Sequence, residues 1–141
     1  MDIDRIVTRL KARLTGLKSI GASADLEAAV DGVMALPAAF VLPLSEDAST
    51  TAVLGMTESR IAEVFGVVHV LSNRRDAQGS AALSDLFGLR VALRKVLVGW
   101  VPDPTTGESV HYTSGRLMSL DPKGRLWWID QFQLTTYFRI S

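Results

Sequence analysis

The chain has 141 residues, with 15 basic and 15 acidic side chains and no cysteine. A formal net charge of zero gives no support for binding to nucleic acid or to an anionic membrane. The absence of cysteine excludes disulfides, thiolate nucleophiles and cysteine-based zinc or iron–sulfur sites. The length fits a single domain over residues 1–141.

Two helices are predicted in the first part of the chain. Residues 3–14 carry apolar side chains at helical spacing, and Asp2 and Asp4 lie near the positive end of that helix. The same segment lacks the apolar stretch and cleavage site of a secretory signal. Ser23 is predicted to cap a second, short helix that Pro37 ends.

Two strands separated by a loop are predicted next. Residues 38–44, AAFVLPL, form a short apolar run that predicts a strand. Residues 45–57 are small and polar and predict a mobile loop. Residues 58–73 predict a long strand with apolar side chains on both faces, so its centre is expected to be covered on both sides.

A core helix and a hairpin are predicted in the second half. Apolar residues return to helical spacing over residues 80–98, at Leu83, Leu86, Phe87, Leu93 and Leu97. Residues 109–120 predict a strand, which the turn Asp121-Pro122-Lys123-Gly124 connects to a final strand over residues 125–140. The order of elements predicts an α+β fold, α-α-β-β-α-β-β, with a single mixed or antiparallel sheet and helices packed on one face.

The final strand, RLWWIDQFQLTTYFRI, carries large side chains on both faces. A small single-layer domain has little material to cover the second face, so we expect Trp127, Ile129 and Tyr137 to contact another subunit. Asp130 interrupts the apolar face. It is either a paired interface carboxylate or a device against edge-to-edge aggregation.

No pattern of residues in the sequence predicts a catalytic, metal-binding or phosphate-binding site. His69 lies among valines and is expected to be a hydrogen-bonded core histidine, whereas His111 is expected to face solvent. No histidine pair has metal-ligand spacing, and no glycine pattern predicts a nucleophile elbow or a phosphate-binding loop. Basic residues on the 80–98 helix favour a solvated face over a nucleic-acid patch. We therefore expect no enzymatic activity, cofactor or metal.

Segments in order along the chain resemble the phage tail terminator family, from Ile6 to Phe138. The most characteristic are Asn73-Arg74-Arg75-Asp76 with Gly79, and Gly99-Trp100. The loop Pro102–Val110 is somewhat long for the pattern. The matching segments are IVTRLKARLTGLKSIGASADLEAAV, PAAFVLPLSEDA, RIAEVFGVVHVLSNRRDAQGSAA, LRVALRKVLVGWVPD and GRLMSLDPKGRLWWIDQFQLTTYF.

The resemblance implies a virion assembly protein without catalytic activity. Such proteins form hexameric rings that stack on the last ring of tail tube protein, stop its polymerisation and offer a surface for head joining. The implied partners are copies of the chain, the tail tube protein and head–tail connector proteins. No membrane or sequence-specific nucleic-acid contact is implied, although the genome can pass through the ring. The implied location is the head-proximal end of the virion tail, and the host cytoplasm during assembly.

Two sets of residues become candidate contacts under this resemblance. The candidate subunit interface consists of Trp127, Ile129, Tyr137, Arg74, Arg75 and Asp76. The candidate tube-contacting loop carries Glu46 and Asp47. Two alternatives stay open: another ring-forming virion component, such as a head–tail connector or minor tail protein, and a ligand- or nucleic-acid-binding module that uses the aromatic strand.

Overall fold

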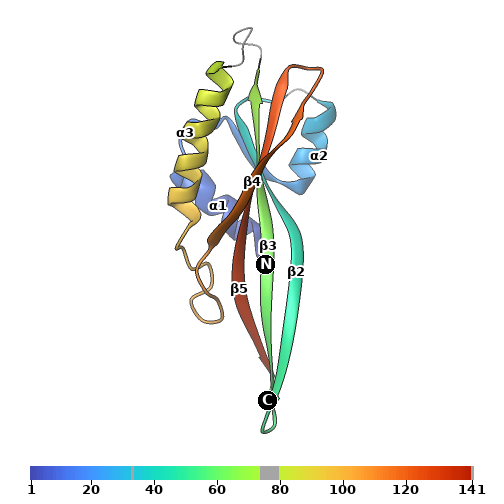
Figure 1. Ribbon diagram of the computed structural model, residues 1–141, viewed down its shortest axis with the longest axis vertical. Helices are drawn as coiled ribbons and strands as arrows, with labels where there is room; N and C mark the ends of the chain where they lie inside the picture. Colours follow the sequence, from blue (N-terminus) through green and yellow to red (C-terminus); the bar gives the residue numbers. More distant parts are fainter. Residues whose placement is uncertain (33, 74–79, 141) are drawn as a thin grey trace.

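The computed structural model describes residues 1–32, 34–73 and 80–140, and it contains one mixed sheet of five strands in the order β1-β2-β3-β5-β4 (Figure 1). Strand β1 is parallel to β2, and every other pairing is antiparallel. The α+β prediction is confirmed, and the predicted order is right except that it lacks β1. The elements are α1 (Ile3–Arg13), β1 (Ser19–Ala22), α2 (Ser23–Asp31), β2 (Ala38–Val53), β3 (Met56–Ser72), α3 (Ser80–Leu97), β4 (His111–Leu120) and β5 (Arg125–Ile140).

The two N-terminal helices begin where short polar side chains satisfy free backbone N–H groups. The side chain of Asp2 accepts a hydrogen bond from the backbone N–H of Arg5 and caps α1. Helix α2 begins one residue differently from the prediction, because Ala22 and not Ser23 is its N-cap residue. The Asp25 carboxylate accepts the backbone N–H of Ala22 at 2.9 Å, so the cap is fixed from within the helix.

The prediction of a loop over residues 45–57 is wrong. Strand β2 continues to Val53, and only Leu54 and Gly55 turn the chain into β3. Both turn residues have positive φ angles, 32° and 79°, which suits a tight hairpin. The end of β5 pairs with β3 as far as Thr57↔Ile140, so a third strand joins this hairpin. We call this three-stranded projection, residues 45–62 and 135–140, the arm (Figure 1).

Each face of the sheet carries its own apolar core. On one face α1 and α3 pack over the stacked rings of Phe65 and Phe132, whose centroids are 5.5 Å apart. On the other face α2 packs over Val68, Trp127 and Ile129. The prediction that the helices lie on one face is therefore wrong for α2, as Figure 1 shows. The predicted double coverage of the centre of β3 is confirmed, because Val67 and Val68 are both buried.

The burial of Trp127 corrects the expectation that its face of β5 is left uncovered. Trp127 is 7% exposed and Ile129 is 3% exposed. The indole N–H of Trp127 donates to Asp121 at 2.7 Å. Arg125 extends beside this ring and donates to the backbone carbonyls of Ala29 and Val30, which ties the end of α2 to the sheet. The chain itself supplies the cover that we expected from a neighbour.

Asp130 lies at the centre of a buried polar network and is itself fully buried. Its carboxylate accepts hydrogen bonds from His69 at 3.0 Å, from the Arg90 guanidinium at 2.9–3.1 Å and from the Trp128 indole at 3.0 Å. Asp130 is not a paired interface carboxylate, because its partners lie inside the chain. It does not protect a sheet edge either, because β5 is not an edge strand. The prediction of a hydrogen-bonded core histidine at His69 is confirmed.

The electrostatics of the network make it sensitive to acid. Burial by itself raises the pKa of Asp130, but the hydrogen bonds from His69, Arg90 and Trp128 outweigh that effect and lower the pKa to about 2. The ordinary value is 3.8. Because the folded-state pKa is lower than that of the unfolded chain, the stabilisation is complete above pH 4 and is lost as the pH falls towards 2.

We predict that Trp127→Ala lowers the free energy of unfolding by about 3 kcal/mol, because it empties a buried site and leaves Asp121 without its indole donor. Tyr137→Ala is the matched control, with an expected loss of about 1 kcal/mol at its partly exposed position. Urea unfolding at one fixed protein concentration measures both. Equal, small losses would show that Trp127 is not a core residue.

We predict that Asp130→Asn costs about 3 kcal/mol at pH 7, because it leaves the Arg90 guanidinium without its counter-charge. The stability of the wild-type chain should fall more steeply between pH 4 and pH 2 than that of the variant, by about 2 kcal/mol in total. Urea unfolding at several pH values gives this difference. Parallel curves for the two proteins would contradict the assigned pKa.

Candidate functional site

The described residues show no candidate metal centre. Within residues 1–32, 34–73 and 80–140, no group of three or more His, Asp or Glu side chains is placed to hold a metal ion. No helix in these ranges is long and apolar enough to cross a membrane. His111 is exposed at the start of β4, as predicted. The Asp130 carboxylate is fully buried, so the site with potential function must be sought on the surface.

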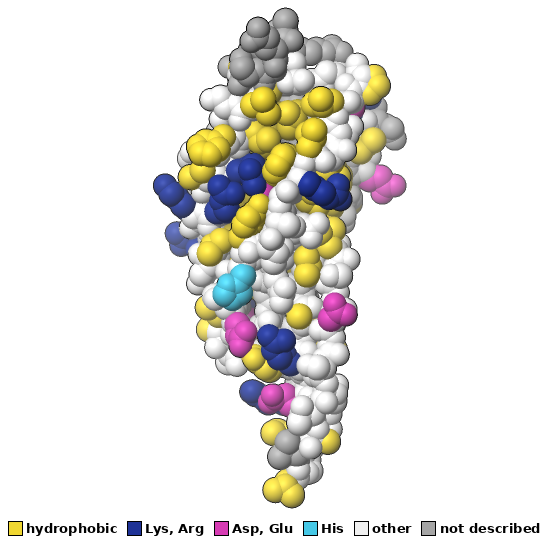
Figure 2. Space-filling model, in the orientation of Figure 1, with side chains coloured by type: hydrophobic (Ala, Val, Ile, Leu, Met, Phe, Trp, Pro, Cys, Tyr) yellow, Lys and Arg dark blue, Asp and Glu magenta, His cyan; other side chains and the backbone are white. Residues whose placement is uncertain are grey.

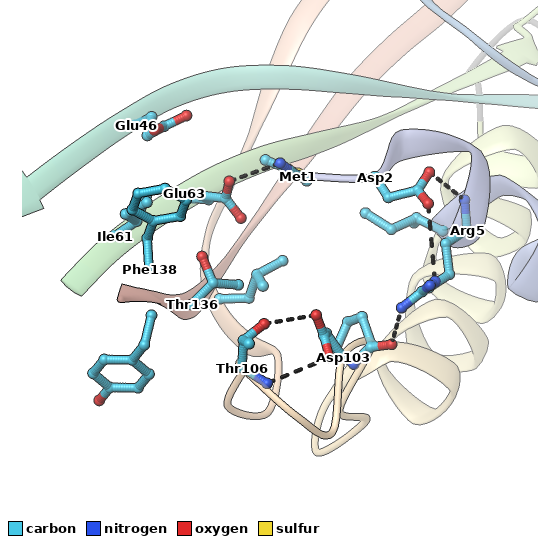
Figure 3. Close-up of a pocket in the computed structure, with 14 residues that line it drawn as sticks. Met1, Asp2, Arg5, Glu46, Ile61, Glu63, Asp103, Thr106, Thr136 and Phe138 are labelled. Atoms are coloured by element: carbon cyan, nitrogen blue, oxygen red, sulfur yellow. Dashed lines mark hydrogen bonds and ion pairs between the residues drawn. The ribbon is translucent and has the colours of Figure 1, made fainter. Parts of the chain in front are cut away.

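A pocket of about 530 Å³ lies at the base of the arm (Figure 3). The start of α1, the loop before β4 and the neighbouring strands β2, β3 and β5 all contribute to its walls. Glu46, Ile61 and Glu63 come from the β2–β3 hairpin, whereas Leu134 and Thr136 come from β5. The pocket therefore depends on parts of the chain that are far apart in sequence.

Most charged groups around this pocket are already engaged. The two oxygens of Asp103 accept hydrogen bonds from Thr105 and Thr106, which hold the pKa of Asp103 well below its usual range. Arg5 donates to the backbone carbonyl of Pro102 and lies 3.9 Å from the carboxylate of Asp2. The hydrogen bond from Arg5 holds the loop before β4 against the start of α1, so this part of the pocket rim has a defined structure.

Glu63 is engaged through only one of its two oxygens. It is only 4% exposed, and one carboxylate oxygen accepts a hydrogen bond from the Met1 ammonium at 2.8 Å. The other oxygen, Oε2, is buried and has no hydrogen-bond partner among the described residues. Glu46 is the cross-strand neighbour of Glu63 and is exposed on the same side, as Figure 3 shows. This side of the pocket therefore has unused capacity to accept hydrogen bonds.

Glu46 and Asp47 do not form one contact, although they are adjacent in sequence. Glu46 pairs with Glu63, and Asp47 pairs with Ala62. Because successive side chains of a strand point to opposite faces, only Glu46 lines the pocket. The predicted tube-contacting pair is thus divided between two faces of the arm.

The tip of the arm is apolar and exposed. Leu54 is fully exposed, and Met56, Phe138 and Ile140 are 38%, 56% and 58% exposed. Figure 2 shows hydrophobic side chains at this narrow end of the molecule. This surface was not predicted, because residues 45–57 were expected to form a mobile loop, although the apolar residues within that segment are a visible signal.

A second apolar surface lies at the opposite, broad end of the molecule (Figure 2). A groove of about 200 Å³ between α3 and β4 is lined by Leu83, Leu117 and Leu120, together with buried residues beneath them. Leu83 and the nearby Phe87 of α3 are 57% and 67% exposed. The prediction that these two residues belong to the core is therefore wrong, because α3 turns its Leu86 and Leu93 side to the sheet.

Three of the six candidate subunit-interface residues lie within the described part of the chain. Tyr137 is half-buried on the arm, where its hydroxyl donates to Glu108 at 2.7 Å. Trp127 and Ile129 lie in the core under α2. Arg74, Arg75 and Asp76 lie outside the described residues. Glu63 was not predicted as a site residue, and its only signal is a carboxylate beside the apolar run of β3.

Comparison with known proteins agrees with the resemblance seen in the sequence. The family model for the phage tail terminator protein matches residues 1–141, which is the whole chain. A search of curated proteins found no significant match. Members of this family are structural components of the virion tail, and their role is to terminate it. The described residues expose large apolar side chains at the arm tip and beside the groove, which is compatible with a structural role. The chain belongs to the phage tail terminator family.

Proposed function

We propose that the protein forms a ring, most simply a hexamer, on the last ring of tail tube protein. The ring stops polymerisation of the tube and provides the surface to which the head joins. Membership of the tail terminator family supports the tail-terminating role. The ring, its subunit number and the two docking surfaces are parts of this proposal.

The observation that carries the proposal is the difference between the two ends of the molecule. The arm projects beyond the helices at one end only and ends in exposed apolar residues, whereas the other end presents the groove between α3 and β4 (Figures 1 and 2). In a ring of identical subunits, all arm tips lie on the same side. One side of the ring can then fit the tube while the other side, which lacks arms, does not accept another tube subunit.

We assign the arm tip to the tube and the groove to the head side. Leu54 and Met56 would be buried against the tube, with Asp47 on the arm as a polar contact. The groove, with Leu83, Leu117 and Leu120 on its walls, would receive a head–tail connector protein. Tyr137 remains a proposed subunit contact, as do Arg74, Arg75 and Asp76, which lie outside the described residues.

The double variant Leu54→Ser, Met56→Ser should bind tube ends at least about tenfold more weakly, because each exposed apolar side chain contributes about 1 kcal/mol or more when it is buried. Electron microscopy of tube assembled with each protein measures capping through the distribution of tube lengths. The matched control is Leu117→Ser, Leu120→Ser in the groove, which should leave capping intact. Equal capping by the tip variant and the wild type would refute the assignment of the tip.

Native mass spectrometry over a range of concentrations should give a closed species near six times the chain mass, alone or with tube protein. A ring uses two different surfaces of each subunit, so closure removes all free surfaces at one stoichiometry. An open series of larger oligomers would contradict ring closure. A monomer at every concentration, with and without tube, would overturn the proposed function.

A further inference from the structure

We infer that Phe87 of one copy inserts into an apolar groove beside α2 of the next copy, and that this contact joins the subunits of the ring. The inference rests on the proposed ring and names the two surfaces that meet in it. The groove lies between α2 and the β4–β5 hairpin, and we call it the α2 groove. It measures about 550 Å³, and its apolar lining consists of Leu26, Val30, Val68, Met118, Pro122 and Trp127.

The polar side chains around the α2 groove are already engaged within the chain. Asp121 accepts hydrogen bonds from Arg125 and from the indole of Trp127. Arg125 and Lys123 donate to the backbone carbonyl of Val30. What these groups leave open to an occupant is mainly apolar surface, and Val30 and its neighbours in the groove gain by leaving water. The α2 groove therefore suits an apolar side chain.

Helix α3 presents a side chain of this kind. Phe87 is 67% exposed, although an aromatic ring of this size is usually buried. Aromatic side chains that fill a pocket contribute much of the binding energy of protein interfaces, because they bury a large apolar area. On the other side of the contact, Val30 and Met118 are 46% and 42% exposed. Both surfaces thus have apolar area to bury.

The two surfaces lie at the same level along the strands, on opposite faces of the sheet. Phe87 follows Leu86, which shares a buried cluster with Leu126 of β5 under α3. Trp127, the next residue of β5, lines the α2 groove on the other face. Figure 1 shows α3 and α2 on opposite sides of the sheet. Rotation about an axis along the strands keeps every point at its level, so a ring can bring these two surfaces together.

The charges beside the two surfaces favour a second copy as the occupant. Glu27 is exposed on α2, one turn before Val30, and α2 contains no basic residue. On α3, Arg94 and Lys95 follow Phe87 by about two turns. In Figure 2 basic side chains gather over α3, and an acidic side chain lies over α2 at a similar height. Opposite charges therefore meet when α3 of one copy approaches α2 of the next, whereas like surfaces repel.

Phe87→Ser tests the side chain that enters the α2 groove. It should raise the dissociation concentration of the ring at least about tenfold, because the aromatic ring is no longer buried by the neighbour. Sedimentation velocity measures dissociation, and circular dichroism verifies that the exposed substitution leaves the fold intact. The matched control is Ile140→Ser on the arm, where the side chain is 58% exposed, and it should leave the ring unchanged.

Cross-linking tests the contact itself, because the chain has no cysteine of its own. Phe87→Cys and Met118→Cys are prepared as separate proteins, one of them isotope-labelled, and are mixed under mild oxidation. Mass spectrometry should find a disulfide between the two different variants and none between identical ones, because a head-to-tail interface brings unlike surfaces together. Phe87→Cys mixed with Asp47→Cys is the control and should give no linked product.

Charge reversal tests the choice of occupant. Glu27→Lys should raise the dissociation concentration about threefold at low salt, with a smaller effect at high salt. Asp47→Lys makes the same change of charge on the arm and should have no such effect. Equal effects of the two variants would show that net charge, and not a local contact with α3, governs assembly.

The outcomes separate this inference from the proposed function. Rings that tolerate Phe87→Ser, or the absence of the mixed disulfide, would overturn the contact and leave the ring in place. If Phe87→Ser does not fold, the disulfide decides. Rings that tolerate Met118→Asp while this variant no longer binds tube would assign the α2 groove to tube protein and would also overturn the inference. A wild-type chain that forms no ring under any condition would overturn both.

Discussion

The carboxylate of Asp130 is the constraint on which the arrangement of the sheet and α3 depends. It is fully buried and is compensated by donors from His69 on β3, Arg90 on α3 and Trp128 on β5. A buried charge is tolerated only when its partners are held in place, so these elements cannot shift independently. The network fixes one position of α3 across the sheet.

Because α3 is held in one position, the choice of which apolar side chains are buried and which are exposed is also fixed. Helices α1 and α3 cover one face of the sheet and α2 covers the other, so the centre of the sheet leaves no large face for a neighbour. The most exposed large apolar side chains are Leu54 at the arm tip and Phe87 and Leu120 beside the groove. These two ends are the surfaces that we propose for assembly into a ring, which needs two different patches on each subunit.

The alternation of side chains along a strand places neighbouring residues of the arm on opposite faces. Glu46 and Asp47 are neighbours in sequence, but the alternation of side chains sends Glu46 to the pocket with Glu63 and Asp47 to the other face. One strand thus presents a carboxylate on each face of the arm. The hairpin is held straight by β5, which pairs with β3 along the arm to Ile140.

The sequence by itself determined the elements whose signal is local. The periodicity of α1, α3, β3 and β5 predicted those elements, and the valines around His69 predicted its core position. Tertiary structure alone decided that residues 45–53 are strand, because their backbone hydrogen bonds are made with β3, although their small polar composition is typical of a loop. It also decided that α2 covers Trp127, and that Met1 reaches Glu63 across 62 positions of sequence. Such contacts depend on packing direction and distant pairing, which local patterns do not encode.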